Sequence, residues 1–461
     1  MFCGLRFQAE KYFFFGLVLV GLAVCATPSH AQLTAKDILD KEIEEFSPKY
    51  QLVDDAIQKL REGDAQTARQ MLDQAYKNNP ELPPGNVMLA QILFASRQIQ
   101  LGRAALEEAK KEAPNDPGAY VYMGDLALNE RRLTDCELLY KEGIEKCKSY
   151  TVNDKRKKRL LAMAYSGLAN LKEVAEDWNE AEKLLRTTLQ YDSENLIALT
   201  RLGRVLFKKA TDLEGEKAAY AVFKQLHQID SERTPLPEIN MALLYQQDGK
   251  TANAKKLMQA ALGKDSNNAR TLLAVAKWAL DANELEMAQS NANNALKLDP
   301  DSLEAKLYIG LVARYKGQFD IAERVFKEAH LQSPKHAGAL TQLALILIES
   351  DEKTKQQLAL EFADLSVRIY PDMTSSYGRE SMMTLAWCLA KQGNLNAAMQ
   401  ATAKALEKGS VTADSAYFAA QILYDAGQSA NAGKILDSAL KSERSFPNRS
   451  AAEALKAKIG G

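Results

Sequence analysis

The sequence predicts an all-α solenoid, in which helix–turn–helix units stack one after another along the chain. Three observations predict this fold: a 34-residue period, a column of small residues at one place in that period, and Gly or Pro where each pair of helices would turn. The composition agrees, because aromatic residues make up only 7% of the 461 residues while Ala, Leu, Lys and Glu are abundant. The pattern therefore favours stacked helices over a β-sandwich or barrel.

The period is carried by frames that start at residues 49, 83, 117, 162, 196, 235, 269, 303, 337, 379 and 413. The eighth position of each frame is Ala or Gly: Ala56, Ala90, Gly124, Ala169, Gly203, Ala242, Ala276, Gly310, Ala344, Ala386 and Ala420. A residue this small lets two helix backbones approach closely, while large neighbours such as Leu72, Leu106 and Phe326 fill the flanking space. Each frame therefore predicts one packed pair of helices.

Glycine and proline punctuate the frames where a helix pair needs a turn. Glycines stand at mid-frame and prolines at the end of the frame, at Gly63, Gly249, Gly317, Gly393 and Gly427 and at Pro80, Pro114, Pro300 and Pro334. The small–large pattern from Ala305 to Pro334, carried by Leu307, Gly310, Tyr315, Gly317, Ala322, Phe326 and Ala329, resembles the tetratricopeptide-repeat (TPR) family. The resemblance covers residues 49–444 and implies a right-handed superhelical solenoid of about eleven repeats.

Three insertions divide the frames into groups. Repeats 1–3 and an insertion take residues 49–161, repeats 4–5 take 162–234, repeats 6–9 take 235–378, and repeats 10–11 take 379–446. Residues 32–48 and 447–461 are expected to form capping helices, which cover the apolar faces of the terminal repeats. Insertions in such repeats usually form loops on one face. The basic run Lys155–Arg159 lies in the first insertion; we interpret it as a solvated helix start, the alternative being a site for an acidic partner or a lipid headgroup.

The first 31 residues have the pattern of a secretory signal peptide. Arg6 and Lys11 precede an apolar run over residues 12–26, and small residues precede a cleavage site before Gln32. The run is shorter than the roughly 20 residues that a membrane-spanning helix needs, and no later apolar run is long enough. We therefore expect export to a periplasm or the extracellular space. Lipoprotein anchoring at Cys25 is the less favoured alternative, because Val24 stands where that motif has a small residue.

Three cysteines follow the predicted leader, Cys136, Cys147 and Cys388. Cys136 and Cys147 lie 11 residues apart in one expected helix. That spacing is about 16 Å along a helix axis, which is too far for a disulfide. We therefore expect buried free thiols rather than a disulfide framework.

The residues that catalysis or nucleic-acid binding would require are scarce. The formal net charge of −1 lacks the basic excess of a nucleic-acid-binding protein. Only His227, His330 and His336 follow the leader, and none is paired with Cys or a carboxylate at metal-ligand spacing. The sequence also lacks a glycine-rich phosphate loop and a nucleophile elbow. We therefore expect neither an enzyme nor a bound cofactor or metal.

Binding of a protein or peptide partner is what the resemblance implies. In the family, positions 2, 5, 9, 12 and 13 of the first helix of each repeat line the concave face. The C-terminal half is apolar in these columns, at Ile239, Leu243, Leu307, Leu311, Tyr315, Met383, Trp387, Tyr417 and Tyr424. These residues suit an amphipathic or extended apolar peptide. The carboxylate clamp of the chaperone-docking members is missing, because Lys and Asn at positions 5 and 9 are replaced by residues such as Val53 and Ile57.

Two alternatives remain open at this point. Neighbouring repeats can bury many of the nine side chains, which then serve packing rather than binding. The apolar surfaces can also join two copies of the chain, so that the protein is a self-assembling structural solenoid of the cell envelope. The identity of the partner is not readable from the residues, because the frame reports packing and the concave columns report only chemical character.

Overall fold

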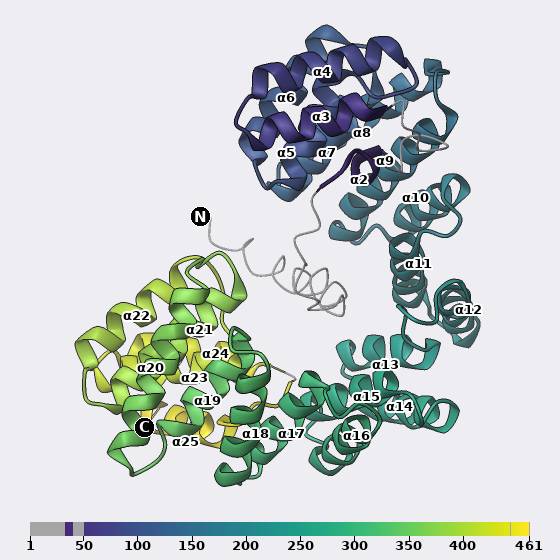
Figure 1. Cartoon of the computed structure of the whole chain (residues 1–461). Coiled ribbons are helices and arrows are strands. Elements are labelled where there is room, and N and C mark those ends of the chain that lie inside the picture. Colours follow the sequence, from purple (N-terminus) through teal and green to yellow (C-terminus); the bar gives the residue numbers. More distant parts are fainter. Residues whose placement is uncertain (1–32, 40–49, 443, 461) are drawn as a thin grey trace. The chain divides into compact units, whose positions relative to one another are not determined.

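The computed structural model describes residues 33–39, 50–442 and 444–460. The predicted signal peptide and most of the predicted N-terminal capping helix lie outside these residues, apart from the short helix α2 (Ala35–Leu39). Every regular element in the described ranges is a helix, and the helices from α3 onward follow one another in pairs joined by short turns (Figure 1). The prediction of an all-α fold built from helix pairs is confirmed.

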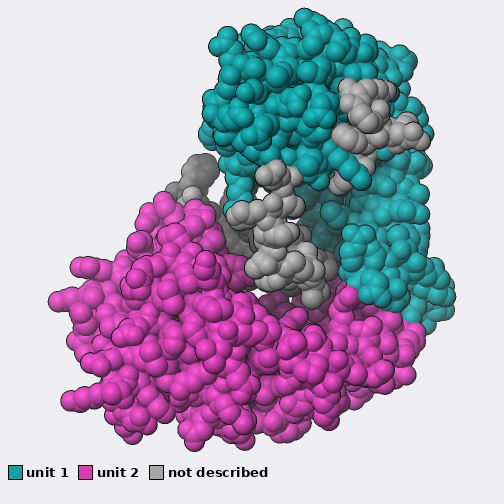
Figure 2. Space-filling view, viewed as in Figure 1, with its two compact units in different colours: residues 1–234 teal, residues 235–461 magenta. Residues whose placement is uncertain are grey.

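The chain divides into two compact units, residues 1–234 and 235–461 (Figure 2). The first unit contains α3 (Gln51–Arg61), α4 (Ala65–Asn78), α5 (Gly85–Ala95), α6 (Ile99–Glu112), α7 (Pro117–Asn129), α8 (Leu133–Ser149), α9 (Asp154–Val174), α10 (Trp178–Tyr191), α11 (Leu196–Lys209) and α12 (Leu213–Ile229). The second contains α13 (Pro237–Gln247), α14 (Thr251–Lys264), α15 (Ala269–Asp281), α16 (Leu285–Leu298), α17 (Leu303–Tyr315), α18 (Phe319–Gln332), α19 (Ala337–Leu347), α20 (Lys353–Ile369), α21 (Ser376–Lys391), α22 (Leu395–Glu407), α23 (Ala413–Asp425), α24 (Ser429–Leu440) and α25 (Arg449–Gly460). The eleven frames thus correspond to the eleven pairs from α3–α4 to α23–α24.

The column of small residues is buried throughout, and its three glycines each face an aromatic ring. A Cβ atom built on Gly310 would lie 2.6 Å from a ring carbon of Phe326, and Gly124 and Gly203 stand in the same relation to Tyr140 and Phe223. Where the column carries Ala instead, the facing position carries a smaller side chain, such as Leu72 opposite Ala56 or Leu106 opposite Ala90. A smaller residue on one helix of a pair is thus matched by a larger residue on the other, as close packing requires.

The turn inside a repeat has one geometry whether or not it contains glycine. The fifteenth residue of the uninterrupted frames has a positive φ: it is Gly in five of them, and it is Arg97, Arg131, Glu176 or Asn283 in the others, with φ between 56° and 61°. At Arg97, this conformation lets the next residue, Gln98, donate its N–H to the carbonyl of Leu93 at 2.8 Å and so close the end of α5. The left-handed backbone is therefore a property of the repeat, and glycine only makes it easier to adopt.

The insertions mainly lengthen helices, which corrects the expectation that they form loops; residues 151–153, 211–212, 350–352 and 373–375 alone are non-helical within them. α9 has 21 residues, and α12 and α20 have 17 each. The extra turns of α9 begin at Asp154 and bury Leu160 and Leu161. Extending a helix that already packs buries more apolar surface than a solvated loop would, which favours the longer helix.

One residue of the basic run corrects the interpretation that the run is a solvated helix start. Arg156 is fully buried, and its guanidinium donates two hydrogen bonds to the carboxylate of Asp116, at 2.6 and 2.8 Å. The same guanidinium lies 5.3 Å from the ring centroid of Tyr150. A buried charge is tolerated when it is paired and hydrogen-bonded in this way. Arg156 therefore ties the third repeat to the fourth.

The three cysteines that follow the predicted leader are buried, and a helix ends the described part of the chain. Cys136, Cys147 and Cys388 are free and buried, and burial raises the pKa of the first two thiols to about 11. α25 begins two residues later than Pro447, where its start was predicted, and packs Ala452 and Leu455 against the last repeat. Within the described residues, no helix is both long and apolar enough to cross a membrane.

Candidate binding groove

A groove of about 680 Å³ opens on the second unit. It is bordered by α17, α18, α19, α21, α23 and the two residues that precede α25, and most of its walls come from positions 9, 12 and 13 of the first helices of their repeats. Its lining comprises Arg314, Tyr315, Gly317, Phe319, Leu345, Glu349, Trp387, Ala390, Lys391, Tyr417, Phe418, Gln421, Asp425, Pro447 and Asn448. The columns expected to be concave thus converge on one cavity within the C-terminal unit.

Three of the nine predicted residues, Tyr315, Trp387 and Tyr417, line this groove. Leu243, Leu307, Leu311 and Tyr424 are half-buried; Leu307 and Leu311 pack against the main core of the unit, and Tyr424 packs against the small core beside α25.

Ile239 and Met383 belong to the core, with 2% and 0% of their surfaces exposed, which corrects their prediction as lining residues. Position 5 is therefore covered at these two sites, whereas Tyr417, at the same position of the last repeat, lines the groove.

Sequence reasoning missed the polar members of the groove. Glu349, Lys391, Gln421 and Asp425 stand at positions 9 or 13 of their frames, in the same columns as the aromatic residues that were selected. An apolar criterion selects none of the four, because their side chains are charged or carry an amide. Reading every residue type at positions 9, 12 and 13 would have found them.

An aromatic cluster forms one wall of the groove. The rings of Trp387 and Phe418 stack with centroids 4.6 Å apart, and Tyr417 lies 6.0 Å from Trp387. Trp387 is only 7% exposed, and its indole N–H donates to Glu349 at 3.1 Å. Rings packed in this way form a rigid apolar surface with a polar edge, which is typical of binding hot spots.

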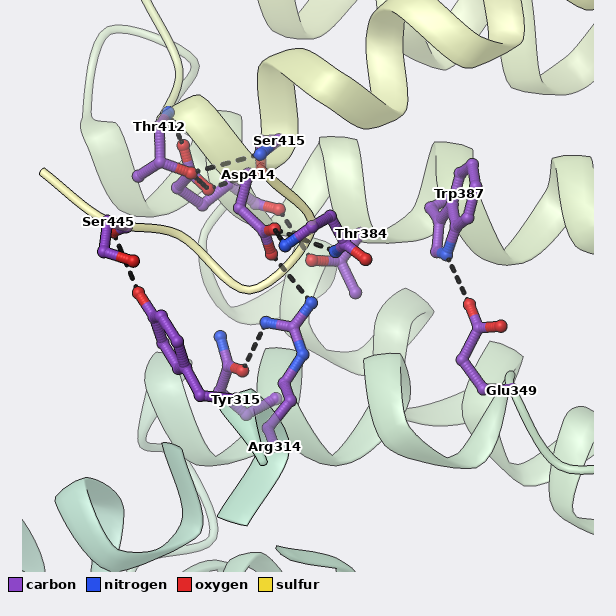
Figure 3. A network of polar contacts seen from close by, with 12 residues as sticks. Arg314, Tyr315, Glu349, Thr384, Trp387, Thr412, Asp414, Ser415 and Ser445 are labelled. Atoms are coloured by element: carbon purple, nitrogen blue, oxygen red, sulfur yellow. Dashed lines mark hydrogen bonds and ion pairs between the residues drawn. The ribbon is translucent and has the colours of Figure 1, made fainter. Parts of the chain in front are cut away.

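Charged pairs lie beside the aromatic wall. Lys391 forms an ion pair with Glu349 at 2.8 Å, and its ammonium also lies 5.3 Å from the Trp387 ring centroid. On the opposite side, Arg314 forms an ion pair with Asp414 at 2.7 Å and donates to Gln342 at 3.0 Å (Figure 3). The groove therefore offers apolar surface flanked by groups of both signs.

The phenols in and beside the groove act as neutral hydrogen-bonding groups. Burial, together with the nearby carboxylates of Asp414 and other acidic residues, raises the pKa of Tyr315 and of Tyr417 above the ordinary value for tyrosine. Tyr315 donates its hydroxyl proton to the backbone carbonyl of Ser445 at 2.9 Å (Figure 3). In the part of the chain that the structure describes, no group of His, Cys, Asp or Glu is arranged to hold a metal ion. The groove is thus equipped for recognition by apolar contact and hydrogen bonding.

The family follows from the repeat and from one comparison. A family model described as "Tetratricopeptide repeat" matches residues 59–138, which run from α3 into α8. The same helix pair, with the same buried small residue, continues through α23–α24. Residues 59–138 are thus identified as tetratricopeptide repeats, and the later helix pairs show the same packing pattern. Because TPR repeats serve protein–protein interaction, the groove is a candidate surface for a protein partner.

Solved structures of TPR proteins are similar to this chain at low identity. A thermophilic TPR protein from Thermus thermophilus is 16% identical, with 42% of this chain and 98% of that chain covered and a TM-score of 0.36. Yeast Tom70 is 16% identical, with coverages of 89% and 95% and a TM-score of 0.41. A TPR protein from Parabacteroides merdae is 14% identical, with coverages of 65% and 99% and a TM-score of 0.35. A search of the curated proteins gave no match.

Proposed function

We propose that this protein is an exported interaction scaffold that binds an apolar peptide segment of a partner in the groove of its second unit. The observation that carries the proposal is the groove itself: it lies on the first helices of four successive repeats and joins a stacked aromatic wall to charged pairs. Interfaces of this kind place aromatic anchors at the centre and polar groups at the rim. Export is supported by the leader-like pattern of residues 1–31.

Phe319 is the residue best suited to test the groove. It lines the cavity at the start of α18 and is 48% exposed, so its removal leaves little unfilled space in the core. Trp387 is less suitable, because its side chain is almost fully buried and its loss would cost about 3–5 kcal/mol of stability. Tyr417, which is half-buried, is a second test position.

The experiment compares capture of native partners by tagged full-length proteins, followed by mass spectrometry. We expect Phe319→Ala and Tyr417→Ala to lose partners that the wild type captures. Ile321→Ala is the matched control, because Ile321 lies in the same helix, is 40% exposed and does not line the groove. If Phe319→Ala and Ile321→Ala give the same partners in the same amounts as the wild type, the groove is not the binding surface.

Export has its own test. Fractionation of the native cells and N-terminal sequencing of the purified protein should find it outside the cytoplasm with Gln32 as its first residue. A cytoplasmic protein that retains residues 1–31 would contradict export and leave the groove experiment intact.

Self-assembly is the second candidate, and a specific surface favours it. Ile99 and Leu101 of α6 and Leu133 and Leu138 of α8 are 41–63% exposed, on the second helices of two successive repeats. Exposed apolar side chains on adjacent helices can mark an interface between protein chains. Sedimentation equilibrium of the wild type and of Leu138→Lys tests this candidate. If both proteins are monomers, self-assembly is excluded; if the wild type is a dimer and the variant is a monomer, self-assembly through this surface is supported.

A further inference from the structure

The connection between α24 and α25 crosses the concave face of the second unit. Ser445 donates its backbone N–H to the carbonyl of Asp281 at 2.9 Å, at the end of α15. Its carbonyl accepts the hydroxyl proton of Tyr315, from α17, at 2.9 Å, and its hydroxyl donates to Asn283 at 3.2 Å. This one residue therefore bonds to two repeats that precede it by more than 100 positions in the sequence.

The following residues are held by the last repeat. Asn448 directs both its backbone N–H and its side-chain amide to the carboxylate of Asp414, at 3.2 and 2.8 Å. The same carboxylate accepts the ion pair from Arg314, whose side chain is only 8% exposed (Figure 3). Asp414 therefore links α23, α17 and the connecting segment.

An aromatic side chain anchors the segment between these two points. Phe446 is 5% exposed and packs in a small core with Ala420, Leu436 and Leu455. Next to it, Pro447 and Asn448 form part of the groove wall, together with Trp387 and Tyr417. The segment Arg444–Asn448, which we call the clasp, thus borders the groove and lies where a bound peptide would continue past Tyr315.

The contacts of the clasp up to Phe446 resemble those of a bound extended peptide, and Pro447 and Asn448 then turn into α25. Its backbone N–H and C=O groups bond to side chains and turns of the repeats, while one aromatic side chain is buried in a pocket. A helical ligand would use most of these backbone groups internally and could not offer them to Tyr315 or Asp414. The repeats therefore offer Tyr315 and Asp414 to an extended backbone, and α23, α24 and α25 together offer a pocket to an aromatic side chain.

We propose that the clasp is an internal ligand of the concave face, and that it competes with an extended, aromatic-bearing segment of a partner for the end of the groove at Tyr315. The proposal rests on the proposed function, because it names what limits access to the same groove. A tethered segment has an effective concentration of roughly millimolar, so a free peptide at micromolar concentration is excluded while the clasp is in place. Displacement of the clasp then opens the groove.

The test uses the full chain and a labelled synthetic peptide with the sequence of residues 441–449, KSERSFPNR. Phe446→Ala empties the aromatic pocket while leaving the groove residues unchanged. We expect the peptide to bind this variant at least about tenfold more tightly than it binds the wild type, as measured by fluorescence anisotropy. A peptide in which Ala replaces its Phe is the control and should bind neither protein.

A further variant locates the bound peptide. Adding Tyr315→Phe to Phe446→Ala removes the hydroxyl that holds the clasp carbonyl, and should weaken peptide binding severalfold. Equal peptide affinity for the wild type and for Phe446→Ala would overturn the proposal, and so would tight binding that Tyr315→Phe does not weaken.

A milder variant serves if Phe446→Ala reduces the helical circular-dichroism signal. Phe446→Leu keeps an apolar side chain in the small core and should show the same direction of effect with a smaller gain. No gain in peptide affinity in this folded variant would likewise overturn the proposal. The assay needs no external partner, so its failure leaves the Phe319 capture experiment, and with it the proposed function, to be judged separately.

Discussion

Replacing Gly310 by Ala tests the packing rule that connects the two helices of each repeat. In an exposed helix, a Gly→Ala change stabilises by about 1 kcal/mol, because Ala loses less conformational freedom on folding. At Gly310 the new Cβ would lie 2.6 and 2.7 Å from two ring carbons of Phe326, which is fully buried. Overpacking of a core costs about 1–3 kcal/mol, so the net expectation is a loss of stability of up to about 2 kcal/mol.

The assay is urea denaturation of the full chain, followed by tryptophan fluorescence. Two of the three tryptophans, Trp278 and Trp387, lie in the second unit and report its unfolding. Gly263→Ala is the control, because Gly263 also lies in a helix of that unit and a Cβ there meets nothing within 4 Å. We expect this control to gain up to about 1 kcal/mol.

A double variant tests whether the ring is the cause. Gly310→Ala with Phe326→Leu recreates the combination of Ala56 with Leu72 and should recover most of the lost stability. If Gly310→Ala stabilises the unit as much as Gly263→Ala does, the close approach of the ring is not what selects glycine at this position. If the double variant is less stable than Gly310→Ala alone, the exchange of volume between the two helices is not the rule.

Three further predictions concern backbone strain, protonation and a buried ion pair. Arg97→Gly should raise the free energy of unfolding by about 0.5–1 kcal/mol in urea titrations, because a left-handed φ is strained for Arg; no gain would argue against strain. Burial raises the pKa of Asp125 to about 6, against about 3.9 when unfolded, so its stabilising effect is complete below pH 4 and is lost as the pH rises through 6. Asp125→Asn should therefore raise the Tm at pH 8 more than at pH 4. An equal change in Tm at the two pH values would refute the raised pKa of Asp125. Asp414→Ala leaves Arg314 buried without its partner and should destabilise the second unit by about 3–5 kcal/mol in the same titrations; a loss below 1 kcal/mol would refute the pairing.

Much of the fold could be predicted because its signals are local and repeated. The distance from Gly310 to Phe326 along the chain recurs in frame after frame, so the pairing of the two helices needs no long-range information. The insertions were harder to predict, because a short polar stretch can extend a helix or form a loop with similar local propensity. At α9 the outcome was decided by the burial of Leu160 and Leu161 against a neighbouring repeat.

The sequence predicted which positions of the repeat contribute to the candidate site, but it did not predict which individual residues line it. Position 9 carries Trp387 at the groove, and position 5 carries both Tyr417, which lines the groove, and Met383, which lies in the core. The same column can face solvent or a neighbour, because the angle between successive repeats decides how much of it the next helix covers. That angle depends on packing along the whole unit and cannot be deduced from the sequence of a single repeat.

The sequence by itself determined the helix pairs, their number and the small residues that let them pack, because these depend on contacts within one repeat. It also determined that Cys136, Cys147 and Cys388 would be buried and unpaired. Only the tertiary structure decided that Ser445 contacts Tyr315 and Asn283. Tyr315 lies 130 positions and Asn283 162 positions before Ser445 in the sequence. No local pattern encodes such a contact, because it arises from the accumulated curvature of several repeats. The groove and the clasp that closes one end of it both depend on that curvature.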